Sequence, residues 1–198
     1  MLLTARNISS LVIDSLCDRA QEENIAVVGL YCDFLSRQEQ TTTNIMGALL
    51  KQLVGRGGPD QVRAAFQKAK REFGGRGPQL ADLMGMLKTV IASLPPVFIC
   101  LDALDECLPK YFPEILASLR DILRESPRTR LFLTGRPHVK EDVQRYFSKA
   151  VVIPINPNPN DIRNYVEMRL DRDSEPEAMS NDLRVDIVRV ILEKISNV

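Results

Sequence analysis

Three carboxylates stand within five consecutive positions of the chain, at Asp102, Asp105 and Glu106. They directly follow the apolar run 97–101, which has the composition of a strand buried on both faces of a parallel sheet. A bare buried carboxylate is very costly, so these charges are tolerated only where they meet water, a metal or a ligand. Open α/β sheets bind ligands at the carboxyl ends of their strands. We therefore expect the three carboxylates at such an edge.

An acidic residue at the end of a buried strand can hold a metal ion beside phosphates. In P-loop NTPases the Walker B aspartate has this position and holds Mg²⁺, which bridges the phosphates. Asp102 is the candidate for that position. A metal-dependent hydrolase that uses the three carboxylates alone is less favoured, because successive strand and turn positions point in different directions. The structural alternative is a buried strand that runs into a solvated acidic turn.

The apolar residues alternate between strand and helix periodicity along the chain. Strands are expected at 25–32, 97–102, 130–134 and 150–154. Helices are expected around 8–22, 45–53, 62–73, 80–94, 113–123, 161–169 and 183–195, with a further short helix between 137 and 150. Strands separated by helices indicate a doubly wound α/β sheet.

The composition fits one soluble domain. Of the 198 residues 44% are hydrophobic and 26% are charged, which is enough for a substantial core. Lys+Arg and Asp+Glu are both 26, and a net charge of zero indicates neither a nucleic-acid surface nor a membrane surface. Arg6 and Asp14 interrupt the N-terminal segment before a signal-peptide core can form, and no apolar run approaches a membrane span. A cytoplasmic location is therefore expected.

The cysteines and the single histidine do not predict a metal site. The four cysteines, at positions 17, 32, 100 and 107, lack Cys-x-x-Cys spacing, and only His138 exists to complete a zinc site. We interpret the cysteines as reduced core or surface thiols. His138 could serve as a base, but a histidine directly after Arg-Pro is more typical of a helix start or of the surface.

Two segments resemble a known family. Residues 101–106 read Leu-Asp-Ala-Leu-Asp-Glu, and residues 131–137 read Leu-Phe-Leu-Thr-Gly-Arg-Pro. Together they resemble the NACHT domain of STAND signal-transducing P-loop NTPases, and in particular the nephrocystin-type NACHT modules of fungal proteins, where ankyrin or WD40 repeats often follow. The resemblance covers nearly the whole chain, including residues 31–34 and 161–165.

The resemblance implies a role for each of several residues. Asp102 matches the Mg²⁺-binding position and Ala103 the small residue after it, while Asp105 and Glu106 match the acids that orient or activate water. Arg136 aligns with the sensor arginine that reports the γ-phosphate. From the residues alone, an arginine hydrogen-bonded in a Gly-Arg-Pro turn is the alternative. The implied cofactors are Mg²⁺ and ATP or GTP.

The phosphate-binding loop of the family has no counterpart in this sequence. That loop reads G-x-x-x-x-G-K-[ST], because glycines let backbone N–H groups approach the phosphates and lysine meets their charge. No glycine precedes Gly29 and no lysine precedes Lys51. The glycine clusters 55–58 and 74–77 follow no strand and are interpreted as turns between helices. We expect the chain to begin after the loop, and to hydrolyse no nucleotide alone.

The expected architecture is a P-loop NTPase-like three-layer α/β sandwich with a mainly parallel sheet that lacks the first strand and the P-loop. Residues 1–156 would form a partial NACHT nucleotide-binding domain and 157–198 the start of a helical extension. Because the missing strand would normally separate 130–134 from 150–154, we expect these two segments not to pair normally.

The function implied is a partial module of an ATP- or GTP-dependent STAND signalling regulator. Its expected partners are proteins or further copies of itself, and a nucleotide if the P-loop is restored, with neither nucleic acid nor membrane. The alternative is a catalytically silent protein-interaction module, or the product of an incomplete gene model.

Overall fold

The computed structural model describes residues 5–55, 64, 67, 78–155, 158–172 and 179–196. The chain divides into one compact unit over Ala5–Val151 and another that begins at Val152. The helix predicted around 62–73 falls almost entirely outside the described residues, as do the glycine clusters apart from Gly55. The predicted domain boundary at 156–157 also lies outside them.

The larger unit is built on a parallel sheet. Its strands are β1 (Ala26–Tyr31), β2 (Val97–Asp102) and β3 (Arg130–Leu133), in the spatial order β1-β2-β3. The register pairs Tyr31 with Asp102, so β1 and β2 end at the same edge, and β3 ends beside them. The central strand β2 is buried at every position except Phe98, which is partly buried. This burial is expected for an apolar run covered on both faces.

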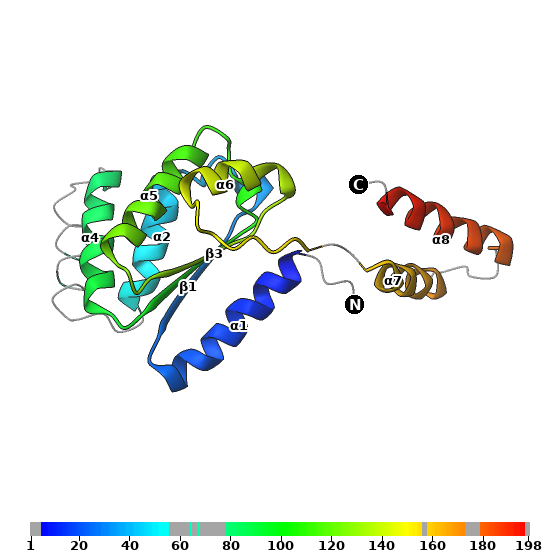
Figure 1. Ribbon diagram of the computed structural model, residues 1–198, viewed down its shortest axis with the longest axis horizontal. Coiled ribbons are helices and arrows are strands. Elements are labelled where there is room, and N and C mark those ends of the chain that lie inside the picture. The colour runs from blue at the N-terminus through cyan, green and yellow to red at the C-terminus, as the bar shows by residue number, and fades with distance from the viewer. Residues whose placement is uncertain are drawn as a thin grey trace. The chain divides into compact units, whose positions relative to one another are not determined.

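Helices cover both faces of the sheet (Figure 1). On one face α1 (Ala5–Glu23) contacts β1 and β2. On the other face α2 (Thr42–Gly55) contacts β1, and both α4 (Leu80–Ser93) and α5 (Phe112–Glu125) pack against α2. A shorter helix, α6 (Lys140–Tyr146), packs against α5. The α/β class predicted from the sequence is thereby confirmed.

The sequence of α5 shows why a helix forms at this place. Pro113 occupies its first turn, where the missing N–H costs nothing, and Glu114 and Arg124 complement the helix dipole at the two ends. Apolar side chains recur every three or four residues and are buried against the other helices: Ile115, Leu116, Leu119 and Ile122.

The side chain of Gln52 on α2 covers the outer edge of β1. The N–H of Gly29 donates to Oε1 of Gln52 at 3.1 Å, and Nε2 of Gln52 donates to the Gly29 carbonyl at 2.8 Å. A Cβ at position 29 would lie 3.3 Å from Cδ1 of Ile13, so α1 approaches this strand closely. The Gln52 amide thus satisfies the backbone groups that a neighbouring strand would otherwise satisfy.

The prediction of a strand at 150–154 is wrong. These residues belong to no strand, and Val151 and Ile153 are 87% and 76% exposed. Apolar β-branched residues favour a strand through packing and pairing with neighbours, and this segment has no strand partner. Because 150–154 forms no strand, the expectation about its pairing with 130–134 is not tested.

The described residues of the second unit form the helices α7 (Pro159–Asp171) and α8 (Asn181–Ser196), as the sequence predicts for the C-terminal region. Asn158 caps α7 by accepting a hydrogen bond from the N–H of Asn160 at 2.9 Å. The helix α8 packs against α7. The small core between them contains Ile162, Val166 and Val188.

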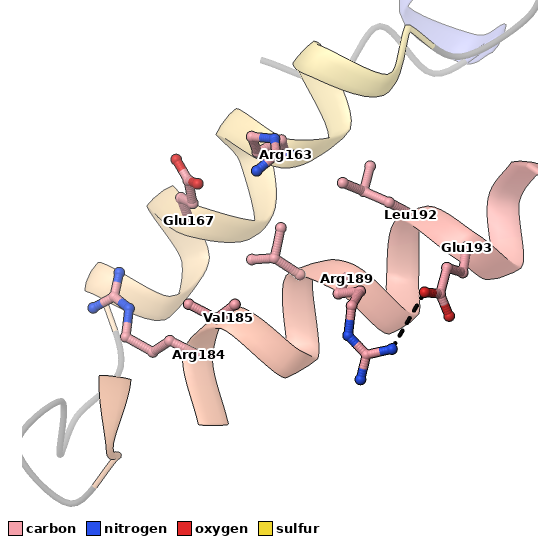
Figure 2. Close-up of a pocket in the computed structure, with 8 residues that line it drawn as sticks. Arg163, Glu167, Arg184, Val185, Arg189, Leu192 and Glu193 are labelled. Atoms are coloured by element: carbon pink, nitrogen blue, oxygen red, sulfur yellow. Dashed lines mark hydrogen bonds and ion pairs between the residues drawn. The ribbon is translucent and has the colours of Figure 1, made fainter. Parts of the chain in front are cut away.

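A groove also lies between α7 and α8, and charged side chains line much of it (Figure 2). Arg189 and Glu193 on α8 form an ion pair of 3.3 Å, while Arg163 and Glu167 extend from α7. None of the site residues predicted from the sequence lines this groove. In the described part of the chain, no helix is long and apolar enough to cross a membrane.

Candidate functional site

Asp102 ends β2 and is buried, with 2% of its surface exposed. Its Oδ1 accepts a hydrogen bond from the hydroxyl of Thr134, the residue that follows β3. The same hydroxyl oxygen accepts a hydrogen bond from the N–H of Ala103 at 3.0 Å. The adjacent strand end therefore supplies a hydrogen-bond partner to the buried carboxylate, as burial of a charge requires.

The chain turns sharply at Ala103, which has a left-handed conformation with φ 53° and ψ 47°. This region costs a residue with a Cβ roughly 1–2 kcal/mol, and such strain is concentrated at functional sites. The N–H of Leu104 then donates to the Thr134 carbonyl at 2.9 Å. The turn leads into the short helix η2 (Leu104–Glu106), which carries Asp105 and Glu106 next to the end of β3.

Arg136 holds both of these acids. Its Nε lies 3.2 Å from Oδ2 of Asp105, and its Nη2 lies 3.3 Å from Oε1 of Glu106. The backbone N–H of Arg136 also donates to Oδ1 of Asp105 at 3.1 Å. The Asp105 and Glu106 side chains are 6% and 15% exposed, whereas that of Arg136 is 70% exposed. An exposed guanidinium therefore covers two nearly buried carboxylates.

Gly135 allows this close approach. A Cβ at position 135 would lie only 2.8 Å from Cγ2 of Val139 and 3.4 Å from Oδ1 of Asp105. Val139 is the last residue of η3 (Pro137–Val139), so a Cβ at position 135 would force the Val139 side chain to shift. Residues 134–136 thus supply in order the Thr134 hydroxyl, the close backbone contact at Gly135 and the Arg136 guanidinium.

The structure brings the predicted residues together at the carboxyl edge of the sheet: Asp102, Asp105, Glu106 and Arg136. Their catalytic and metal-binding roles stay predictions. Thr134 was not identified from the sequence as a site residue. Its position directly after β3, beside the end of β2, could have indicated it. His138 is exposed in η3, in agreement with a surface role. The four cysteines are free, and three of them are buried.

The fold alone shows which class of proteins the chain resembles. Among solved structures it resembles the ORC1 protein of Aeropyrum pernix in complex with DNA, with a TM-score of 0.56 and 17% identity. The match covers 86% of this chain and 43% of that chain, so this chain spans less than half the length of ORC1. At this identity the likeness shows the fold alone, which is that of a P-loop NTPase-like α/β domain.

The sequence comparison then identifies the family. Residues 7–136 match the family described as nephrocystin 3, N-terminal, and the chain belongs to this family. The matched range contains the whole sheet and ends at Arg136, so it includes every site residue described above. The comparison with curated proteins gives no significant relative.

Proposed function

We propose that this chain is a partial nucleotide-switch module of a STAND-type, ATP- or GTP-dependent signalling regulator. The observation that carries the proposal is the joint position of three groups at one sheet edge: the Asp102 carboxylate, the Asp105–Glu106 pair and the Arg136 guanidinium. In this proposal Asp102 is the Walker B aspartate, Asp105 and Glu106 orient or activate water, and Arg136 is the sensor arginine.

The oxygen atoms at the end of β2 fit Mg²⁺. This ion is usually bound through one or two carboxylates together with substrate phosphates and water, rather than by a cage of protein ligands. The Asp102 carboxylate and the Thr134 hydroxyl supply hard oxygen donors of this kind. When bound, Mg²⁺ would neutralise phosphate charge. Within the described ranges, no three His, Cys, Asp or Glu side chains are grouped to hold a metal ion.

Arg136 has the contacts of a sensor that can exchange partners. It lies against Asp105 and Glu106 at 3.2 Å and 3.3 Å, yet most of its side chain is exposed. Arginine binds phosphate oxygens with the same forked geometry that it uses for carboxylates. A γ-phosphate would compete for this guanidinium and release the two acids, which couples the nucleotide state to the position of η2.

A second candidate function is a catalytically silent protein-interaction module. One observation favours it: no G-x-x-x-x-G-K-[ST] sequence occurs in the 198 residues. Both candidates take proteins or further copies of the chain as partners. The zero net charge supplies no electrostatic reason for nucleic-acid binding, and the DNA complex of ORC1 is a property of that protein.

Nucleotide binding and hydrolysis distinguish these candidates. We expect no Mg²⁺-dependent ATP or GTP hydrolysis above background by the 198-residue chain, and little change in its melting temperature at millimolar nucleotide. A form extended upstream by a strand and a G-x-x-x-x-G-K-[ST] loop should bind nucleotide. In that form Asp102→Asn should remove the Mg²⁺ dependence and reduce hydrolysis by roughly 100-fold.

The matched control is Asp142→Asn, because Asp142 is an exposed carboxylate on α6 that pairs only with the neighbouring Arg145 among the described residues. It should leave binding and hydrolysis unchanged. Nucleotide binding by the extended form that does not depend on Asp102 would contradict the proposed site. Hydrolysis by the unextended chain that is lost in Glu106→Gln would instead reject the silent alternative.

A further inference from the structure

Cys32 and Cys107 are far apart in the sequence and in contact in the fold. Cys32 directly follows β1 and Cys107 directly follows η2, and their Sγ atoms are 3.2 Å apart. Both residues are buried, with 2% and 4% of their surface exposed. A disulfide bond has an S–S distance of about 2.0 Å, so the two sulfurs need to approach by only about 1 Å.

We propose that Cys32 and Cys107 form a reversible disulfide, a redox modification site beside the edge of the sheet that carries Asp102. The observation behind the proposal is the contact between two buried thiols at a chain separation of 75 residues. It does not depend on nucleotide binding. The oxidant in this proposal is hydrogen peroxide.

The two cysteines have different chemical roles. The hydrogen bond between the two thiols lowers the pKa of Cys107, whereas this hydrogen bond and burial raise the pKa of Cys32. Because the thiolate is the nucleophilic form of cysteine, the proposal assigns the first step to Cys107, the thiol whose pKa is lowered. Cys32 keeps its proton until the second step and acts as the resolving cysteine.

Oxidation then proceeds in two balanced steps. The Cys107 thiolate attacks one oxygen of hydrogen peroxide, the O–O bond breaks, and a sulfenic acid forms while the released hydroxide takes up a proton to become water. The Cys32 sulfur next attacks the Cys107 sulfur, the S–O bond breaks as the S–S bond forms, and the Cys32 proton leaves with hydroxide as a second water. Two thiols are oxidised by two electrons and the peroxide is reduced. A small thiol reverses the reaction by exchange.

The disulfide would link the end of β1, which pairs with Asp102, to the end of η2, which follows Asp102 in the sequence. The N–H of Cys32 donates to the Asp102 carbonyl at 2.9 Å, and the N–H of Cys107 donates to the Leu104 carbonyl at 3.2 Å. A covalent bond between these cysteines would fix η2, with Asp105 and Glu106, to the end of β1. Closing a loop of this length should raise the melting temperature by roughly 10 °C.

The test is oxidation of the folded, reduced chain with hydrogen peroxide, followed by alkylation and peptide mapping without reductant. We expect a Cys32–Cys107 linked peptide that dithiothreitol removes, and a fall in titratable thiols from four to two. The Cys32→Ser variant should accumulate a sulfenic acid on Cys107 that dimedone traps, whereas Cys107→Ser should give no dimedone adduct on Cys32. The control Cys17→Ser should form the disulfide normally and should accumulate no sulfenic acid on Cys107.

Cys17 on α1 and Cys100 on β2 supply the competing outcome, because these two elements are in contact. A Cys17–Cys100 bond, a bond between chains, or four remaining thiols in protein that circular dichroism shows to be folded would each overturn the proposal. The mapping uses the unmodified chain, so it decides the matter even if a serine variant fails to fold.

Discussion

The hydroxyl of Thr134 donates a hydrogen bond to the carboxylate of Asp102 and accepts one from the N–H of Ala103. One side chain thus supports both the buried charge and the left-handed turn that follows it. Thr134 is therefore a positioning residue, whose loss should affect the acidic segment even though it carries no charge.

Thr134→Val keeps the shape of the side chain and removes the hydroxyl. We expect it to destabilise the fold by about 1–3 kcal/mol, because the Asp102 carboxylate and the Ala103 N–H each lose a partner. The measurement is the free energy of unfolding from urea titrations. Thr134→Ser retains the hydroxyl and should recover most of the loss, whereas equal stability of the valine variant and the unmodified chain would show that this hydrogen bond is unimportant.

Arg136→Gln removes the positive charge above Asp105 and Glu106. Two nearly buried carboxylates then lack their counter-charge, although the exposure of Arg136 limits the effect, and we expect a loss of about 1–2 kcal/mol. The loss should be smaller in high salt. Arg145→Gln disrupts the exposed Arg145–Asp142 pair and should cost less than about 0.5 kcal/mol. The measurement is a urea titration of each variant at low and at high salt. Equal losses of stability in the two variants would contradict the role given to Arg136.

Gly135→Ala introduces a Cβ only 2.8 Å from Val139. We expect a destabilisation of about 1–3 kcal/mol from this overpacking. Gly85→Ala is the control of opposite sign, since Gly85 lies within α4 with nothing within 4 Å of the added Cβ, and it should stabilise by about 0.5–1 kcal/mol. Adding Val139→Ala to Gly135→Ala should restore part of the loss, and a purely additive double mutant would show that the clash is not the cause.

The Cys100 thiol makes stability depend on alkaline pH. Burial raises the pKa of Cys100 from 9.0 to about 11, so the unfolded chain releases this proton at a lower pH than the folded chain. The contribution is complete below pH 9.0 and is lost as the pH rises towards about 11. A shift of this size corresponds to about 2–3 kcal/mol.

Urea titrations between these pH values, compared with those of Cys100→Val, isolate the contribution of this thiol. The unmodified chain should lose stability more steeply than the variant over this interval. Parallel pH profiles would show that the thiol does not stabilise the folded state in this way.

The sequence predicts the structure best where the local pattern of residues determines which residues are neighbours in space. The run 97–101 is apolar throughout and has to be buried, so β2 and the acidic segment after it could be placed correctly. The segment 150–154 is also apolar, but the strand predicted there was wrong. A strand needs a neighbouring strand to pair with, and the local sequence does not show whether one is present. The contact between Cys32 and Cys107 spans 75 residues and was invisible for the same reason.

The Gln52 amide blocks the edge of the sheet at β1. A further polypeptide adding at β1 would have to displace this amide from both backbone groups of Gly29. The Gln52 side chain therefore hinders pairing of this edge of the sheet with another chain, which is one way in which proteins avoid edge-to-edge aggregation.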